Sequence, residues 1–411
     1  MARRAISGVR VWDGRSSTLG ESRSVILVDG DTIEAVVDES QVGSLDPDVQ
    51  VFHYESERVA IPGLIDCHVH MTLDPTIFSA DAQLEVPTER VWAGMHQRAL
   101  AMVQAGITTA RDLGAGEWME VELRDRIAAG ALVGPRLLCV GQPLTAPRGH
   151  CHFWGGEARG SDAVREVIER QVAHDVDWIK VMATGGVFTK GTDVSKPQYD
   201  ADELREIVGC AGSHGRSVAA HCHGLSGIKN AFASGIRTVE HCSFAGGDGF
   251  GADFEESFVP QMVRDDVWVS PTVNAGWARR AEKDGKPTPF WERMSKCLSS
   301  LRGEGVQLVA STDAGIPGVQ HHQLPEGLKA FARYADLSCV EALRSATSEA
   351  ARALGIADET GALRSGLSAD VVVVDGDPTR DLGALQRPQL VLARGRVVYE
   401  ADWDRAARAA R

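Results

Sequence analysis

The chain has 411 residues, of which 43% are hydrophobic, and its formal net charge is −14 at pH 7. This length and composition allow a sizeable core, and α/β barrels of this length occur as one unit. The acidic balance argues against nucleic acid, or an anionic membrane held by a basic patch, as a partner. The sequence shows no membrane-length apolar run, no signal-peptide pattern and no Cys-x-x-Cys pair among its eight cysteines, so we expect a cytoplasmic protein with reduced thiols.

Short β-rich runs occur at both ends of the chain. The first three expected strands cover 5–12, 23–28 and 32–37, and runs of the same style return at 369–375 and 390–399. The residues between these ends have a different sequence pattern. We therefore predict a small β domain formed by residues 1–60 and 359–411, with a larger domain, residues 61–358, inserted in it.

The middle of the chain alternates apolar strands with amphipathic helices, a pattern typical of a parallel sheet covered by helices. Eight strands are expected, around 64–71, 107–113, 136–140, 178–183, 217–223, 238–244, 267–272 and 306–312. Eight such units predict a (β/α)₈ TIM barrel, with its site at the C-terminal strand ends. An open doubly wound sheet is the alternative, but no Gly-rich nucleotide loop follows the first strand. Loops 249–251 and 276–288 are candidate lids.

Potential metal ligands stand at the ends of these strands. His68 and His70 end the first strand, and their spacing puts both imidazoles on one face. Lys180 lies inside the apolar fourth strand, where burial favours a neutral amine that can react with CO₂. The remaining strand-end candidates are His221, His241 and Asp313. Together, these residues predict a metal site at one mouth of the barrel.

Several motifs support one family resemblance. Residues 62–70 read Pro-Gly-Leu-Ile-Asp-x-His-x-His, and residues 311–315 read Ser-Thr-Asp-Ala-Gly. Further matches are the Thr-Thr-Ala-Arg-Asp run at 108–112, Glu-His at 240–241 and the Gly-x-Leu-x-x-Gly-x-x-Ala-Asp pattern at 361–370. In these motifs the chain resembles the amidohydrolase superfamily over nearly its whole length. The resemblance implies a (β/α)₈ barrel with a β-sandwich domain built from both chain termini.

The resemblance also implies a centre with two divalent metal ions. One ion would be held by His68, His70 and Asp313, and the other by His221 and His241. Lys180, as a CO₂-derived carbamate, and a hydroxide would bridge the two ions. Zn is the expected metal, with Mn, Fe or Co as alternatives. The hydroxide would attack a carbonyl carbon, and Asp313 would act as general acid/base.

Within this superfamily, the sequence pattern of the chain most resembles that of the Xaa-Pro dipeptidase-like and imidazolonepropionase-like members. By this resemblance, His150 is a catalytic residue that polarises the scissile carbonyl, and His223 contacts substrate. Trp154 belongs to an aromatic loop, suited to an aryl or heterocyclic substrate. Position 224 is Gly, where the deaminase branch carries a Glu, so deamination is disfavoured.

The sequence thus predicts hydrolysis of an amide, peptide, carbamate or cyclic amide C–N bond in a small-molecule substrate, by a protein we expect to form a homo-oligomer. The alternatives are a mononuclear cyclic amide hydrolase, an ester or phosphoester hydrolase on the same centre, and a non-catalytic scaffold. Ordinary roles stay open for three residues: an ion pair for Lys180, loop capping for His150 and second-layer hydrogen bonding for His223.

Overall fold

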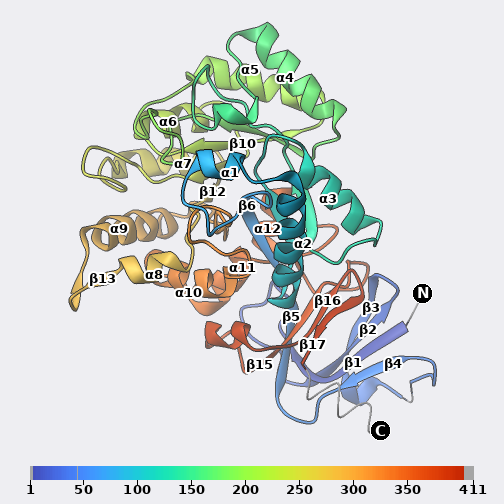
Figure 1. Cartoon of the computed structure of the whole chain (residues 1–411). Helices are drawn as coiled ribbons and strands as arrows, with labels where there is room; N and C mark the ends of the chain where they lie inside the picture. Colours follow the sequence, from blue (N-terminus) through green and yellow to red (C-terminus); the bar gives the residue numbers. More distant parts are fainter. Residues whose placement is uncertain (1–2, 44, 402–411) are drawn as a thin grey trace.

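The computed structural model describes residues 3–43 and 45–401. Strands from both ends of the chain pair in one sheet, seen at the lower right of Figure 1 as blue and red arrows. Its members are β1 (Arg3–Val11), β2 (Arg23–Asp29), β3 (Thr32–Asp38), β4 (Gln50–His53), β5 (Arg58–Pro62), β15 (Val371–Asp375), β16 (Pro388–Ala393) and β17 (Arg396–Glu400).

The two chain ends meet where β5 pairs with β15 in antiparallel register, Ala60 opposite Val373. The strand order is β17-β16-β15-β5-β1-β2-β3, and β4 pairs with β1. Alternate side chains of these strands, among them Ile6 and Ile26, form a buried apolar cluster. The sheet thus joins both termini, while its arrangement as a sandwich and the domain boundaries stay predictions. Residues 1–2, 44 and 402–411, which the predicted β domain includes, lie outside the described residues.

The middle of the chain has a TIM-barrel-type α/β architecture made of two parallel sheets. One sheet contains β6 (Leu64–Val69), β7 (Ile107–Asp112) and β8 (Arg136–Cys139). The other contains β9 (Trp178–Met182), β10 (Ser217–Cys222), β11 (Thr238–His241) and β12 (Trp268–Ser270). Their side chains are nearly all buried, which explains the continuous apolar runs in the sequence.

The eighth predicted strand, 306–312, forms no regular strand in the described part of the chain. Only isolated bridges link it and the residues after it to their neighbours, Leu308 to Val269 and Ala314 to Val69. Val309 N donates to Val269 O of β12, but two other backbone donors of the segment are used outside the sheet: Ala310 N donates to Ser345 O and Thr312 N to the Asp66 carboxylate. A regular closed barrel of eight strands is therefore absent from the residues described.

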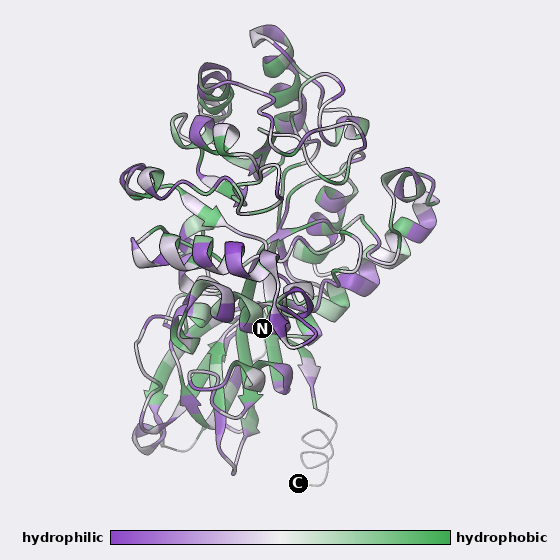
Figure 2. Cartoon of the chain, turned by 90° about the vertical axis from the view of Figure 1, so that its left-hand side faces the viewer, coloured by the Kyte–Doolittle hydropathy of each residue, from purple (hydrophilic) through white to green (hydrophobic). Residues whose placement is uncertain are grey.

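Helices cover the parallel sheets, and in Figure 2 their outer faces carry much of the hydrophilic colour, whereas the strands are largely green. The longer helices are α2 (Thr88–Gln104), α3 (Met119–Ala128), α4 (Ser161–Ala173), α5 (Ala201–Ser213), α9 (Pro289–Gly303) and α10 (Leu324–Ala335). The shorter ones are α1 (Ala80–Leu84), α6 (Leu225–Phe232), α7 (Val259–Arg264), α8 (Gly276–Arg280), α11 (Cys339–Ser345) and α12 (Ser348–Leu354).

Short 3₁₀ turns complete the chain: η1 (Glu39–Gln41), η2 (His152–Trp154), η3 (Glu256–Phe258) and η4 (Leu382–Gln386). The segment 276–288 folds as α8 followed by the small hairpin of β13 (Glu282–Lys283) and β14 (Lys286–Pro287).

Candidate active site

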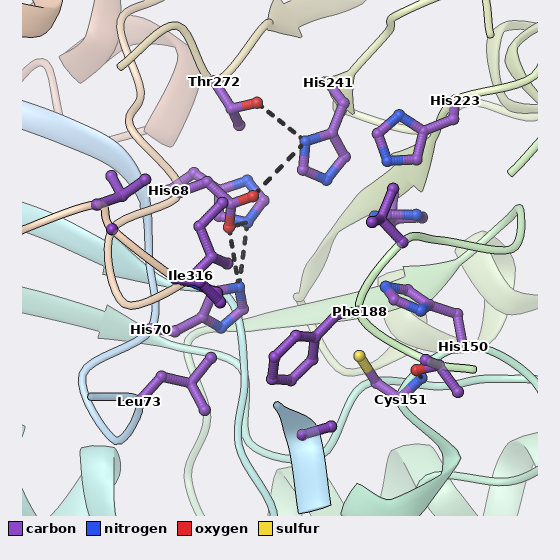
Figure 3. A pocket seen from close by; sticks show the side chains of 18 of the residues that line it. His68, His70, Leu73, His150, Cys151, Phe188, His223, His241, Thr272 and Ile316 are labelled. Carbon is purple, nitrogen blue, oxygen red and sulfur yellow. Dashed lines mark hydrogen bonds and ion pairs between the residues drawn. The ribbon is translucent and has the colours of Figure 1, made fainter. Parts of the chain in front are cut away.

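A cavity of about 910 Å³ opens at the C-terminal ends of the parallel strands. Strand ends and the loops after them position its polar lining, and Figure 3 shows the imidazoles pointing toward one another across it. The cavity is lined by every predicted site residue: His68, His70, His150, Trp154, Lys180, His221, His223, His241 and Asp313. The residues predicted from their positions near strand ends thus lie around one cavity, although they are up to 245 positions apart in the sequence, from 68 to 313.

The first ligand group consists of His68, His70 and Asp313. The Nε2 atoms of the two histidines lie 3.3 Å apart, and Asp313 Oδ1 lies 3.3 Å from His68 Nε2 and 3.4 Å from His70 Nε2. Ligands about 2.0–2.1 Å from a tetrahedral Zn²⁺ are separated from one another by roughly 3.3 Å. The three atoms thus form one face of a metal-sized tetrahedron, and this group fits a divalent ion.

The second group consists of His221, His223 and His241, whose ligand atoms all lie within 4.8 Å of one another. The sequence predicted His221 and His241 as ligands and His223 as a substrate contact. The His221 and His241 rings are inclined by 75°, so their lone pairs can converge. The His223 ring is stacked on that of His241, with an interplanar angle of 17° and ring centroids 4.6 Å apart. The assignment of His221 and His241 as ligands and of His223 as a substrate contact stays a prediction.

Hydrogen bonds to carbonyl oxygens fix which nitrogen of His70 and of His221 is free. His70 Nδ1 donates to Gly114 O at 2.9 Å, and His221 Nε2 donates to Gly185 O at 3.1 Å; a carbonyl can only accept, so the opposite nitrogens carry lone pairs. Hydroxyls hold Nδ1 of the other two rings of the second group: Thr272 pairs with His241 at 3.0 Å and Ser243 with His223 at 2.8 Å.

Glu240 orients His68 from beneath the site. Its Oε2 lies 3.0 Å from His68 Nδ1, while its Oε1 accepts from Arg111 Nη2 at 2.8 Å and from the Thr238 hydroxyl at 2.6 Å. Burial alone would raise the pKa of Glu240, but the Arg111 charge and the His68 hydrogen bond hold it well below its usual range. The carboxylate stays ionised and keeps the His68 proton on Nδ1, which leaves Nε2 for a metal.

Lys180 is completely buried, and its Nζ has no hydrogen-bond partner among the described residues. Burial lowers the pKa of Lys180 to about 8. Its charge acts on Asp313 and His68 of the first group and on His221 and His241 of the second. Lys180 is therefore buried, as predicted, and it lies beside both ligand groups. Because its pKa is lowered, its neutral amine form is populated near neutral pH.

Asp313 is held ionised in this environment. Burial by itself would raise its pKa, but the neighbouring imidazoles of His68 and His70 lower it to about 2. Its backbone N donates to His68 O, and Asp313 adopts a left-handed backbone conformation with φ of 60°. This bend carries the carboxylate out of the irregular eighth segment and into the cavity.

His150 lies on the opposite wall, its ring 4.6 Å from that of His221. Its Nδ1 has no partner among the described residues, and burial lowers its pKa to about 3. Gly186 packs flat on this ring, because a Cβ there would lie 2.4 Å from it. His150 is thus a neutral, well-packed imidazole at the cavity wall.

Loops supply the rest of the lining, which sequence reasoning largely missed. Phe250, in a predicted lid, stacks on His223 with ring centroids 5.0 Å apart, and Trp277, in the other, also lines the cavity. Phe78 and Phe188 line it as well. A single aromatic residue in a loop carries no periodic signal, so only the predicted lids pointed to any of these side chains.

No helix in the described part of the chain is both long enough and apolar enough to cross a bilayer.

The fold and the two ligand groups define a TIM-barrel-type hydrolase with a candidate metal centre. The chain belongs to the amidohydrolase family, whose model matches residues 59–398. As a member it is a hydrolase acting on C–N bonds, which confirms the predicted class of enzyme, and the family chemistry is metal-dependent.

Its relatives agree with the predicted resemblance. The chain is 27% identical over 361 residues to an ochratoxinase of Aspergillus niger, covering 81% of this chain and 73% of that protein. It is 25% identical over 386 residues to an imidazolonepropionase of Chloroflexus aggregans, covering 83% of each. A solved Xaa-Pro dipeptidase with methionine in its active site superposes with a TM-score of 0.83 at 26% identity, over 97% of this chain and all of that one.

Proposed function

We propose that this protein hydrolyses an amide-type C–N bond at a centre of two divalent metal ions, which are joined by Lys180 as a carbamate. The observation that carries the proposal is the buried, unpartnered Lys180 amine beside two metal-sized ligand groups. A buried ammonium without a partner is costly, whereas a carbamate held by two cations satisfies both its charge and its oxygens.

His68, His70 and Asp313 would hold one ion, and His221 and His241 the other. Zn²⁺ suits these imidazole and carboxylate donors, and Mn²⁺, Fe²⁺ or Co²⁺ are the alternatives. When bound, the ions would supply an activated hydroxide and polarise the carbonyl. Water is then added across the C–N bond, giving a carboxylate and an amine.

The chain's own residues supply the remaining steps. Asp313 is ionised at neutral pH, so it can accept the proton of the attacking water and pass it to the leaving nitrogen. His150 is neutral and can donate a hydrogen bond to the carbonyl oxygen as negative charge develops there. His223 and Trp154 both line the cavity and would hold the substrate.

The test is the metal content per chain of protein purified without chelator and supplied with bicarbonate. Two ions per chain, falling in Lys180→Met, together with hydrolysis of N-acyl amino acids, dipeptides or aryl carbamates, is the expected result. One ion per chain in both proteins would favour a mononuclear cyclic amide hydrolase. No bound metal after reconstitution would overturn the proposal.

A further inference from the structure

A chain of aromatic rings leads from the candidate metal centre to the mouth of the cavity. The Trp154 ring lies 5.6 Å from His70, Phe153 lies 5.5 Å from Trp154, and Phe188 lies 6.1 Å from Phe153. The last two contacts are edge-to-face, the geometry in which aromatic rings attract one another. We call Trp154, Phe153 and Phe188 the aromatic wall; Figure 3 shows Phe188 facing the histidines.

The mouth itself exposes apolar side chains that a monomer would ordinarily bury. Phe78 is 77% exposed, Leu84 53% and Val187 75%, and all three line this one cavity. Only three other large hydrophobic residues among those described are as exposed as 40% or more, and none of them lines the cavity. A clustering of this kind around a concave site marks a surface that an apolar ligand covers.

The cavity is also larger than the reaction requires. Its volume of about 910 Å³ lies near the upper end of the roughly 300–1,000 Å³ typical of small-molecule sites. The two ligand groups, Lys180 and His150 act only on the scissile amide. The aromatic wall and the exposed apolar residues carry no charge. The outer lining also contains Lys190, which is paired with Asp81 at 3.5 Å, and two arginines, Arg279 and Arg280, of which Arg280 lies over the Phe290 ring. The outer volume is therefore shaped for a bulky apolar group.

We infer that the substrate carries a large aromatic group, bicyclic or bigger, on one side of its scissile C–N bond, and that the aromatic wall and Val187 bind this group. This inference rests on the proposed function and narrows its substrate class. Addition of water breaks the C–N bond, and the aromatic group leaves on either the carboxylate or the amine product.

The test compares three amides on the metal-loaded protein. N-(2-naphthoyl)-L-alanine places the bicyclic ring on the acyl side, L-alanine 2-naphthylamide places it on the amine side, and N-acetyl-L-alanine has no ring. At least one naphthyl amide should exceed N-acetyl-L-alanine by about tenfold or more in kcat/KM, since the ring buries a large apolar area. The preferred amide also shows which product carries the ring.

Binding is measured separately, by calorimetry with 2-naphthoate and with acetate, because both carboxylates meet the centre alike and differ only in the ring. Phe188→Ala should lower the naphthoate preference by about tenfold, whereas Phe188→Leu, which keeps apolar volume, should lower it less. Val187→Ser should weaken naphthoate about threefold through lost apolar contact. Val133→Ser, at a residue 49% exposed and outside the cavity, is the matched control and should change nothing.

The outcomes separate the two proposals. Hydrolysis of all three amides at similar kcat/KM keeps the hydrolase and overturns the aromatic inference. No hydrolysis, but a naphthoate preference that Phe188→Ala removes, would keep the aromatic wall as a binding site and overturn the hydrolase proposal, and with it the inference about a scissile bond. Equal binding of naphthoate and acetate overturns the inference. The inference is also overturned if Val187→Ser changes the oligomeric mass of the protein and leaves naphthoate binding unchanged.

Discussion

His68 Nδ1 lies 3.0 Å from Glu240 Oε2, and the second oxygen of the same carboxylate lies 2.8 Å from Arg111 Nη2. All three side chains are buried. One carboxylate thus both neutralises a guanidinium in the interior and fixes the tautomer of a predicted metal ligand, so we expect the stability of the fold and the affinity of the proposed metal site to depend on the same residue.

Replacing Glu240 by Gln should therefore affect both properties. We expect metal affinity to fall about 10–100-fold, because Gln has only one acceptor oxygen for His68 and Arg111 and no charge, and the free energy of unfolding to fall by about 3–5 kcal/mol, because Arg111 loses its buried counter-charge. Metal titration and urea unfolding measure the two effects. The double variant Arg111→Met with Glu240→Gln should recover stability without recovering affinity; unchanged affinity in both variants would contradict the orienting role.

Lys180→Ala tests the carbamate. We expect metal affinity to fall by more than the about 10–100-fold that loss of a supporting residue costs, and activity to fall with it. A short-chain carboxylate such as propionate should partly restore both, since it can enter the space left by the side chain. Lys180→Met fills that space and should resist rescue. Full activity of Lys180→Ala without added carboxylate would contradict the proposal.

His150→Ala should lower kcat by about 10²–10³ at unchanged metal content, if the imidazole stabilises the developing oxyanion. Steady-state kinetics and metal analysis of the same preparation measure both quantities. His152→Ala, two positions along the same loop, is the control and should keep a kcat near that of the wild type. A loss of metal in His150→Ala would instead indicate a structural role.

His223→Ala distinguishes a substrate contact from a third metal ligand. Because its ring is stacked on His241, we expect metal content to persist and KM to rise, by about tenfold for one lost hydrogen bond to a charged group. His241→Ala is the matched comparison and should lose metal. Equal metal loss in the two variants would assign His223 to the ligand set.

Glu120, on α3, predicts a pH dependence of stability away from the cavity. Neither of its carboxyl oxygens has a hydrogen-bond partner among the described residues, and burial, with the Asp112 charge, raises its pKa to about 8. Between its ordinary pKa and 8 the folded protein holds a proton that the unfolded chain has released. The contribution of the protonated Glu120 carboxyl to folding stability is therefore present in full below about pH 4.5 and is lost as the pH rises through about 8.

Glu120→Gln removes this titration. Between pH 4.5 and 8 the free energy of unfolding should therefore fall less in the variant than in the wild type, and the difference should be about a few kcal/mol, the energy equivalent of the pKa shift. Urea unfolding across that range measures the difference in slope. Glu122→Gln, exposed on the same helix, should keep the wild-type slope. Parallel pH profiles for wild type and Glu120→Gln would contradict the raised pKa.

The sequence by itself determined the parallel strands, the helix starts and the convergence of the site. Asp200 with Glu203, and Ser338 with Glu341, form capping boxes at the starts of α5 and α11, and this signal depends only on residues three positions apart in the sequence. His68 and His70 share a face because strands alternate, and strand ends of a parallel sheet meet at one edge. These features follow from local geometry, which sequence spacing records.

Only the tertiary structure decided the relations between distant segments. The Glu240–Arg111 pair, the stacking of His223 on His241 and the aromatic wall each depend on how separate strands and loops pack. In the eighth segment, Val309 N pairs with β12, whereas the backbone donors of Thr312 and Ala310 reach Asp66 and Ser345, residues that no local pattern associates with the segment. Hydrogen bonds and ring contacts form between whichever groups the packed chain brings within about 3–6 Å of one another, and that distance is set by the whole fold.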